Sequence, residues 1–316
     1  MGRYVLRRLG FLLLTLALTS ILVFGAMQLV PGDVARIVLG RAASPEAVAE
    51  LRSEMGLDAP LPVQYARWLG DFATGDWGKA YTRPQQPEIR PLVMEKLGNS
   101  LRLAALVLLL AVPLSLALGI WAGLSEGRAA DNAISVGALA AVGLPEFVTG
   151  LILIEVFTYA LGWLPGSATG AAEAPLPQAL PQLILPAVTA TLVLLAYISR
   201  LVRAGVIEEL TKPYVRTATL KGLSKRVVIG KHVLRNALLP TVTVIAISFG
   251  WLVGGLIVIE VVFNYRGLGL LLLTAIESRD LPLVQAITMV IVLGVALANL
   301  AADLLYAYLN PRIRLQ

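Results

Sequence analysis

The chain has 316 residues, of which 57% are hydrophobic and 15% are charged, and its mean hydropathy is +0.78. Soluble chains contain roughly 45–50% apolar and 25% charged residues, so this composition excludes an ordinary soluble protein and indicates a membrane protein. The absence of cysteine excludes disulfides and thiolate metal sites, and His232 is the only histidine. The net charge of +6 is an excess that membrane topology alone produces, and no nucleic acid partner is expected.

Six membrane spans are predicted, because a helix needs about 20 mainly apolar residues to cross roughly 30 Å of hydrocarbon. The first follows the basic stretch "MGRYVLRR". Its apolar run exceeds the roughly 7–15 residues of a signal-peptide core and has no clear cleavage site, so we expect it to stay as a membrane helix. The predicted spans are residues 9–30, 100–124, 132–161, 183–207, 239–263 and 283–309.

The distribution of Lys and Arg predicts the orientation. With the N-terminus inside, the cytosolic segments carry fifteen basic and four acidic side chains, whereas the long outer segment 31–98 carries eight basic and nine acidic ones. Positive charge accumulates on the cytosolic side of membrane proteins, so both termini are predicted to face the cytosol.

The outer loops differ in character. Residues 31–98 mix apolar residues with Pro, Gly and charge, which predicts short helices at the membrane interface rather than a separate domain. The loop "GWLPGSATGAAEAPLPQALPQ" is predicted to be irregular. The loop "NYRGLGLLLLTAIESRDLP" contains an apolar run too short to cross the membrane, so we expect an interfacial or re-entrant helix there.

Prolines and small residues lie within or beside the spans. Prolines in membrane helices often mark bends, and they occur here at Pro113, Pro145, Pro186, Pro240 and Pro282. Two GxxxG spacings, Gly119 to Gly123 and Gly250 to Gly254, allow close approach of helices. The second pair is favoured, because Gly255 extends it, whereas the first is as well explained by scattered small residues.

Ionisable groups inside a span are candidates for function, because exposure to lipid costs roughly 2.5–3.5 kcal/mol each. Here they are Glu146, Glu155, Glu260, Asp303 and Arg102, with Asn299 one turn before Asp303. Arg102, Glu155 and Glu260 fall near the outer ends, within reach of water. The candidates for a translocation path or a subunit contact are therefore Glu146 and Asp303 first, then Asn299 and Glu260.

Catalytic motifs do not fit the predicted topology. "GLSEG" matches the serine hydrolase elbow, but that elbow needs a preceding strand, and Ser125 ends a predicted membrane helix. Neither HExxH nor the phosphate-binding GxxxxGK[ST] occurs in the chain. We expect no catalytic residue, no metal site and no ATP hydrolysis in this chain.

The basic stretch "YVRTATLKGLSKRVVIGKHVLRNALLP", residues 214–240, lies between two apolar spans. Thr211 is predicted to cap a first helix that ends near Lys221, where Gly222 provides a left-handed stop. Ser224 is predicted to cap a second helix. Its apolar face holds Val227, Ile229, Gly230, Val233, Leu234, Ala237 and Leu238, and Arg226 and Val228 are the exceptions to the pattern.

Three interpretations of this stretch compete. A basic loop lying on anionic lipid explains the charge but not the helix, glycine, helix design. A DNA-binding helix-turn-helix fits the local pattern, but its position between adjacent spans argues against it. A rigid projection that fits a groove on a soluble partner explains both the charge and the shape.

The same residues resemble the cytoplasmic EAA signature of ABC importer permeases, in the form typical of the peptide and nickel permease family. The signature reads Glu-Ala-Ala, three residues, then Gly. Here Arg216, Thr217, Ala218 and Gly222 take these places, and the acidic residue is missing, as is usual in this branch. Further matches cover nearly the whole chain: "LVPGD", "GLDAPLPVQYARWLGDFATGDWG", "NSLRLAAL", "GWLPGS", "YISRLVRAGVIEEL", "GGLIVIEVVFNYRGLG" and "NLAADLLYAYLNPRIR". Glu146 in "GLPEF" departs from the small polar residue expected there.

The resemblance implies an all-α, six-helix permease subunit of the type I ABC importer fold in the bacterial inner membrane. Residues 1–98 would form a first helix with an outer segment, and residues 99–316 a five-helix core with a coupling loop at about 208–238. The expected partners are a second homologous permease, two ATPase subunits that bind ATP and Mg²⁺, a substrate-binding protein and membrane lipid. The residues expected to receive the ATPase are Arg216, Thr217, Ala218, Gly222, Leu223, Lys225, Arg235, Asn236 and Pro240.

The resemblance implies peptide transport, with nickel or another small solute as the alternative on the same plan. The outer loops 31–98 and 263–281 would contact the binding protein and gate the path. A stand-alone secondary transporter is the alternative from another class, but neither internal repeats nor a midplane ion site is evident in the sequence.

Overall fold

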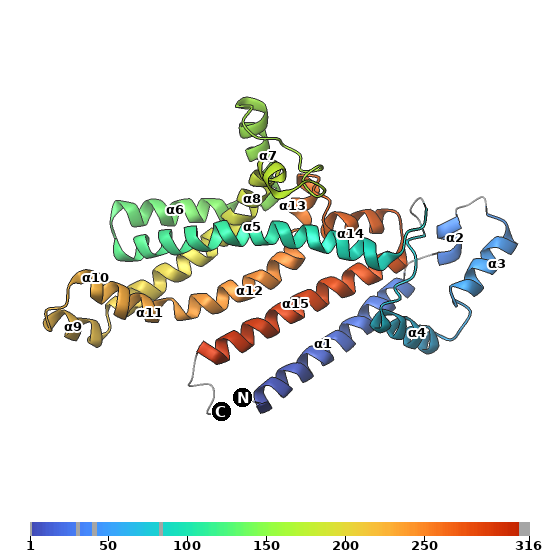
Figure 1. The fold of residues 1–316 in the computed structure, drawn as a ribbon, viewed down its shortest axis with the longest axis horizontal. Helices are drawn as coiled ribbons and strands as arrows, with labels where there is room; N and C mark the ends of the chain where they lie inside the picture. The colour runs from blue at the N-terminus through green and yellow to red at the C-terminus, as the bar shows by residue number, and fades with distance from the viewer. Residues whose placement is uncertain (1, 30–31, 40–42, 82–84, 310–316) are drawn as a thin grey trace. The chain divides into compact units, whose positions relative to one another are not determined.

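In a computed structural model, described for residues 2–29, 32–39, 43–81 and 85–309, the chain is largely helical (Figure 1). Two bent helix pairs raise the number of candidate spans from four to six if each pair counts as one span. The predicted all-α class is therefore confirmed. The four helices that are individually long and apolar enough to cross a membrane are α1 (Gly2–Gln28), α5 (Ile89–Leu124), α8 (Leu176–Leu210) and α15 (Leu281–Leu309).

The helices form two compact units. Among the described residues, the first comprises Leu101–Tyr265 and residues 297–309, and the second comprises Gly2–Ser100 and Arg266–Ala296. Segment Arg266–Ala296 thus groups with the N-terminal part of the chain, while the predicted division after residue 98 stays a prediction.

Helix α8 is the centre of the first unit. Its side chains run through the main core cluster, where Leu183, Ile198, Val202 and Val206 are fully buried. Helices α6, α7, α11, α12 and α13 all pack against it. The remaining helices of this unit are α6 (Ala129–Gly143), α7 (Glu146–Ile154), η1 (Glu155–Ala160), α12 (Leu239–Gly255) and α13 (Ile257–Val262), together with the short helices between α8 and α12.

Helix α5 crosses α8 at two glycines. A Cβ atom at Gly119 would lie 2.6 Å from the Ser199 carbonyl oxygen, and one at Gly123 would lie 2.8 Å from the Val206 Cβ. Backbones approach this closely only where the side chain is a hydrogen atom. The first pair is therefore a tight helix crossing and not a chance spacing of small residues, and the interpretation as scattered small residues was wrong. Gly255 meets Trp251 of its own helix, and the role of the Gly250–Gly254 pair stays a prediction.

Two of the expected prolines lie at breaks. Pro145 separates α6 from α7 at a bend of 101°, so the apolar run 132–161 is not one straight span. Leu144 is extended, as a residue before proline prefers. Pro240 lies in the first turn of α12 after a bend of 48°. Pro113 and Pro186, by contrast, lie inside continuous helices.

Two helices begin before the predicted spans. Helix α5 begins at Ile89 rather than near residue 100, and α8 begins at Leu176 rather than near residue 183. Both extra segments bury apolar side chains, among them Ile89 and Ala179, so packing extends the helices beyond the length that hydrocarbon thickness requires. The loop predicted to be irregular, residues 162–182, is non-helical only as far as residue 175, and its remainder belongs to α8. It is held by a hydrogen bond of 2.7 Å from the Ala168 N–H to the Phe263 carbonyl oxygen.

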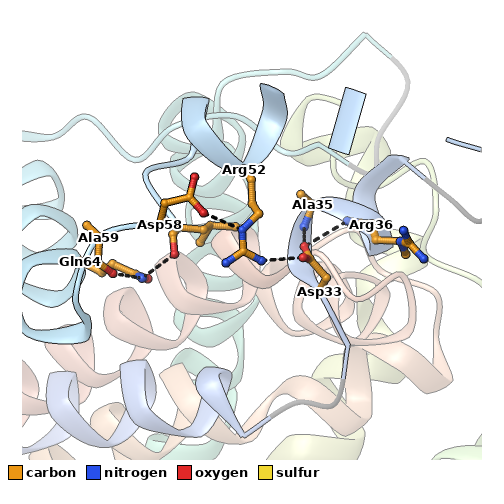
Figure 2. Close-up of polar contacts among 8 residues, drawn as sticks. Asp33, Ala35, Arg36, Arg52, Asp58, Ala59 and Gln64 are labelled. Atoms are coloured by element: carbon orange, nitrogen blue, oxygen red, sulfur yellow. Dashed lines mark hydrogen bonds and ion pairs between the residues drawn. The ribbon is translucent and has the colours of Figure 1, made fainter. Parts of the chain in front are cut away.

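The second unit contains the predicted short outer helices, α2 (Val34–Leu39), α3 (Pro45–Glu54) and α4 (Leu61–Thr74). Arg52 joins their ends, as Figure 2 shows: its Nη1 donates to Asp33 Oδ2 at 2.6 Å and its Nε donates to Asp58 Oδ1 at 2.7 Å. Asp33 also accepts from the Ala35 N–H at 2.9 Å. Asp33 and Asp58, which lie 25 residues apart in the sequence, thus meet at one arginine.

A short apolar helix, α14 (Leu268–Glu277), is present where an interfacial or re-entrant helix was predicted, and its place relative to a membrane stays a prediction. The Leu268 N–H donates to Ser100 Oγ at 2.8 Å, and Asn99 Nδ2 donates to the Arg266 carbonyl oxygen at 2.9 Å. Its buried side chains, including Leu271, join a core cluster with Ile89. The polar start of "NSLRLAAL" therefore anchors the loop before the last span.

Candidate functional site

The basic stretch forms a compact projection at one end of the first unit, between the end of α8 and the start of α12 (Figure 1). We call it the basic projection; it consists of α9 (Pro213–Leu220), α10 (Lys225–Val227), η2 (Val228–Val233) and α11 (Leu234–Ala237). Gly222, at the junction of α9 and α10, has φ +79°, which confirms the predicted left-handed stop.

The predicted caps were only partly right. Thr211 does not cap the first helix; its hydroxyl donates to the Glu208 carbonyl oxygen at 2.8 Å and so closes the end of α8. Ser224 does precede the second helix in an extended conformation, but only its backbone oxygen caps, accepting from the Val227 and Val228 N–H groups. At the start of α9, Pro213 takes the first helical position, and no side chain caps the helix.

A π-helical turn, η2, changes the register of the second helix. Val228, Val233 and Ala237 are buried together, although uniform 100° steps place Val228 on the polar side. The spacing of five residues from Val228 to Val233 matches the i to i+5 bonding of a π-turn. The prediction of Val228 as an exception was therefore wrong, because the tertiary fold inserts an extra residue into one turn.

Close contacts attach the basic projection to α8. A Cβ atom at Gly205 would lie 2.8 Å from the Ala237 carbonyl oxygen, so α8 and α11 touch through their backbones. Tyr214 Oη hydrogen-bonds the Glu209 carboxylate, and Asn236 Nδ2 donates to Tyr214 Oη at 3.1 Å. The sequence did not indicate this role of Tyr214, because nothing in the neighbouring residues shows that a tyrosine will hydrogen-bond both α8 and α11.

At this attachment the Glu208–Lys212 pair is charged and the phenol of Tyr214 is neutral. Burial raises the pKa of Tyr214, and its hydrogen bond to Glu209 raises it further. The hydrogen bond from Lys212 to Glu208 raises the pKa of that lysine, which stays protonated. In the neutral range the Tyr214 hydroxyl therefore keeps its proton, and Lys212 keeps its ion pair with Glu208.

The outward surface of the basic projection combines apolar and basic side chains. Leu220 is 79% exposed and Leu223 is 40% exposed, on either side of Gly222. Basic or polar residues surround them. The exposed members of the predicted set are Arg216, Thr217, Gly222, Leu223, Lys225, Arg235 and Pro240. Ala218 is buried instead, and Asn236 is exposed but bonded to Tyr214.

The candidates within the spans lie apart from this surface. Glu260 is buried on α13 at 1% exposure, and Glu146 is half-buried at the start of α7. The Glu146 Oε2 atom is buried without a hydrogen-bond partner among the residues that the structure describes. On α15, Asn299 is exposed and Asp303 is half-buried. Their role in a path stays a prediction.

A strong ion pair was missed by the sequence analysis. Arg203 of α8 donates from Nε to Asp131 Oδ1 at 2.5 Å and from Nη2 to Asp131 Oδ2 at 2.8 Å. Asp131 also accepts from the Gly127 N–H and from Ser135 Oγ. Both residues had been counted only as charges that determine topology. In the described part of the chain, no group of three or more acidic residues or histidines is placed to hold a metal ion.

Two protein-family models match nearly all of the chain. Residues 115–315 match the model described as "Binding-protein-dependent transport system inner membrane component", and residues 1–90 match the N-terminal model of the same membrane component.

Curated relatives align end to end. A probable peptide ABC transporter permease of Sinorhizobium fredii is 36% identical over 99% of this chain and 100% of its own length. A putative peptide permease of Brucella ovis is 39% identical over 99% of both chains. A glutathione transport system permease of Escherichia coli K12 is 38% identical over 99% of both.

One solved structure shares the fold. A crystal structure of an amino acid ABC transporter with histidines matches with a TM-score of 0.54 and 13% identity, covering 69% of this chain and 94% of that chain. At this identity the likeness concerns the fold alone, and it agrees with the predicted importer permease architecture.

Proposed function

Because this chain belongs to the family of binding-protein-dependent transport system inner membrane components, we propose that it is a subunit of an ATP-driven importer of di- or oligopeptides. The peptides would cross the membrane through a path that this chain forms with a second homologous permease. Members of this family are multi-pass, non-catalytic inner membrane components without a cofactor of their own, and partner ATPases handle ATP. The chain is accordingly a permease subunit and not an enzyme.

The basic projection is the observation that supports an ATP-driven importer, because it offers a docking surface for an ATPase subunit. Leu220 and Leu223 offer apolar side chains beside an otherwise basic rim, which suits a groove on a soluble ATPase subunit. The projection is continuous with α8 and α12, and the Gly205–Ala237 contact leaves little room for it to move alone. A push on this surface would therefore displace α8, around which the unit is packed.

Gly222→Asp tests this coupling role. A Cβ at Gly222 meets no atom within 4 Å, so the variant has room to fold, and Asp tolerates positive φ better than most residues. We expect it to insert normally but to lose ATPase co-purification and uptake, because it places negative charge in the basic surface. Gly222→Asn adds the same bulk without charge and isolates the electrostatic part of the effect.

Gly127→Asn provides the positional control. Gly127 also has positive φ, +72°, with nothing within 4 Å of its Cβ position, but it lies in the turn between α5 and α6. This variant should retain ATPase co-purification. Normal uptake and assembly in Gly222→Asp would contradict the coupling role.

The peptide substrate is supported by the relatives, whose names divide between peptides and glutathione, itself a tripeptide. Mass spectrometry of the ligand on the co-purified binding protein, followed by uptake of that ligand into proteoliposomes, tests it. A nickel or sugar ligand with no peptide uptake would overturn the substrate and leave the coupling role standing. Uptake that ignores ATP and follows an ion gradient would instead indicate a secondary transporter.

The topology completes the proposal. Both termini and the basic projection would face the cytosol, which agrees with the excess of Lys and Arg in those segments. The segments around α2–α4 and α14 would then face outward, toward the binding protein. A cysteine introduced at Lys221 should be labelled by a membrane-impermeant maleimide only in inverted vesicles, whereas one at Gln86 should be labelled in intact spheroplasts.

A further inference from the structure

A groove opens between α8 and α12 on the first unit, with a volume of about 420 Å³. We call it the α8–α12 groove, and its walls include Val193, Tyr197 and Arg200 of α8 and Val244, Ser248 and Trp251 of α12. Its volume falls within the range of about 300–1,000 Å³ that is usual for small-molecule sites.

The groove lies within the membrane-crossing length of these helices. Gly205 touches Ala237, so these two residues mark a common level on α8 and α11. At about 1.5 Å per residue, Arg200 lies roughly 7 Å from Gly205 along α8, and Val193 lies roughly 18 Å away. The groove therefore extends toward the middle of the span, with its cation at the end nearer the basic projection.

The charge of Arg200 decides what kind of occupant the groove suits. Arg200 is exposed, and no hydrogen bond or ion pair joins its side chain to any other residue in the described part of the chain. Charged groups in spanning helices face a water-filled cavity or a partner rather than lipid tails, because the cost in hydrocarbon is high. Arg200 thus gives the otherwise mostly apolar groove one positive charge that is free to pair with a ligand.

Among the remaining polar groups of the lining, Ser248 complements this charge. Ser248 Oγ donates its proton to the Val244 carbonyl oxygen at 2.8 Å, so toward a ligand it can only accept a hydrogen bond. Tyr197 is 62% exposed and Trp251 is 40% exposed, and both present aromatic surface. The groove therefore combines a donor for an anion, an acceptor for an N–H group and aromatic walls for apolar side chains.

On this basis, and resting on the peptide importer function proposed above, we propose that the α8–α12 groove holds the substrate in transit, with Arg200 binding the terminal carboxylate of the peptide. A guanidinium pairs with a carboxylate through two parallel hydrogen bonds, which a lysine cannot reproduce. The Ser248 hydroxyl accepts from a peptide N–H, and the aromatic walls accept varied side chains without strong selection.

Photo-crosslinking tests the location directly. The complete importer is reconstituted with p-benzoylphenylalanine in place of Tyr197, loaded with a radiolabelled peptide on its binding protein, and irradiated during ATP turnover. We expect label on this chain. The same replacement at Tyr159, which is 75% exposed on η1 outside the groove, is the control and should give background labelling. Equal labelling at the two positions, or none at Tyr197 while uptake proceeds, would overturn the proposal.

Uptake of matched peptides tests the role of Arg200. A dipeptide is compared with its C-terminal amide, at concentrations that load the binding protein fully with either. Losing a charge-assisted hydrogen bond should slow the amide by about tenfold in the unmodified importer. Arg200→Gln should slow the free acid to a similar degree and leave the amide unchanged, while Arg200→Lys keeps an intermediate preference. Arg128→Gln, the same change in an exposed turn, should preserve the full preference.

The Arg200 variants distinguish binding of the peptide carboxylate from a structural role of this arginine. If Arg200→Gln slows both peptides equally, Arg200 serves a lipid headgroup or a subunit contact and the proposal is wrong. If the importer assembles poorly with Gln, the preference of Arg200→Lys decides, since an unchanged preference would also contradict the proposal. Absence of any peptide uptake by the unmodified importer would overturn the peptide function itself, which is a separate failure.

Discussion

Arg203 holds Asp131 through two parallel hydrogen bonds, of 2.5 and 2.8 Å, and so joins α8 to the first turn of α6. Asp131 is 2% exposed and Arg203 is 32% exposed. Arg203 lies on α8, the helix to which the basic projection is attached, two residues before Gly205, which touches α11. It therefore ties the helix that would receive the ATPase stroke to the broken α6–α7 pair.

Breaking this pair should loosen α6 from α8. In Asp131→Asn we expect hydrogen exchange in residues 125–135 to become several-fold faster, because the Arg203 fork loses its carboxylate. Arg203→Lys should give a smaller increase, since it keeps the charge without the two parallel bonds. Exchange measured by mass spectrometry on the purified complex decides, and unchanged protection in both variants would mean that the pair contributes nothing to this packing.

The glycine crossing of α5 and α8 should not accept a methyl group. Gly119→Ala places a Cβ 2.6 Å from the Ser199 carbonyl oxygen, and we expect a loss of about 1–3 kcal/mol of stability from overpacking. Gly137→Ala in α6 is the matched control, because its Cβ position has nothing within 4 Å. There the change should be neutral or stabilising by up to about 1 kcal/mol, from helix propensity. Thermal unfolding of the purified complex compares the two, and equal midpoints would contradict the crossing.

Substitution of an exposed apolar residue of the basic projection should weaken ATPase binding, whereas substitution of a buried one should lower stability. Leu220→Ala removes a side chain that is 79% exposed, so we expect unchanged thermal stability but weaker ATPase co-purification. Val228→Ala removes a side chain that is 5% exposed, and should cost about 1.5–3 kcal/mol of stability. If Leu220→Ala lowers stability while retaining the ATPase, this leucine is part of the core and not of a docking surface.

The outer network around Arg52 should weaken in acid. Burial raises the pKa of Asp33, but the Arg52 guanidinium and two backbone N–H groups outweigh it, so the net pKa lies below the ordinary value. A depressed carboxyl pKa contributes stability that is present above its unfolded value, roughly pH 3.9, and is lost as pH falls through the folded value. Limited proteolysis of the 33–58 segment should therefore accelerate at about pH 4 and below.

Variants assign this acid effect to the pair. Asp33→Asn should remove much of the pH dependence and give faster cleavage already at neutral pH. Arg36→Gln alters an exposed side chain of the same helix, whose backbone rather than guanidinium contacts Asp33, and should behave like the unmodified chain. Identical acid profiles for Asp33→Asn and the unmodified protein would assign the effect to other carboxylates.

Much of this molecule followed from local pattern. Apolar runs longer than hydrocarbon thickness predicted the spans, and the short apolar run before residue 280 predicted α14. Gly222 predicted a left-handed stop because its neighbours favour helix on both sides and glycine alone adopts positive φ without cost. These features depend on hydrophobicity and on backbone preference, which are properties of each segment by itself.

Tertiary packing decided the rest. Both GxxxG pairs permit close approach, and only the arrangement of α5 against α8 makes Gly119 and Gly123 a contact. The π-turn that buries Val228, the Tyr214 brace and the Arg203 fork on Asp131 each join residues that are far apart in sequence or inconsistent with a regular helix. The sequence by itself determined that the chain crosses the membrane and carries a basic helix pair. Which charges bind one another was decided only when distant helices packed, because complementarity is a property of two surfaces together.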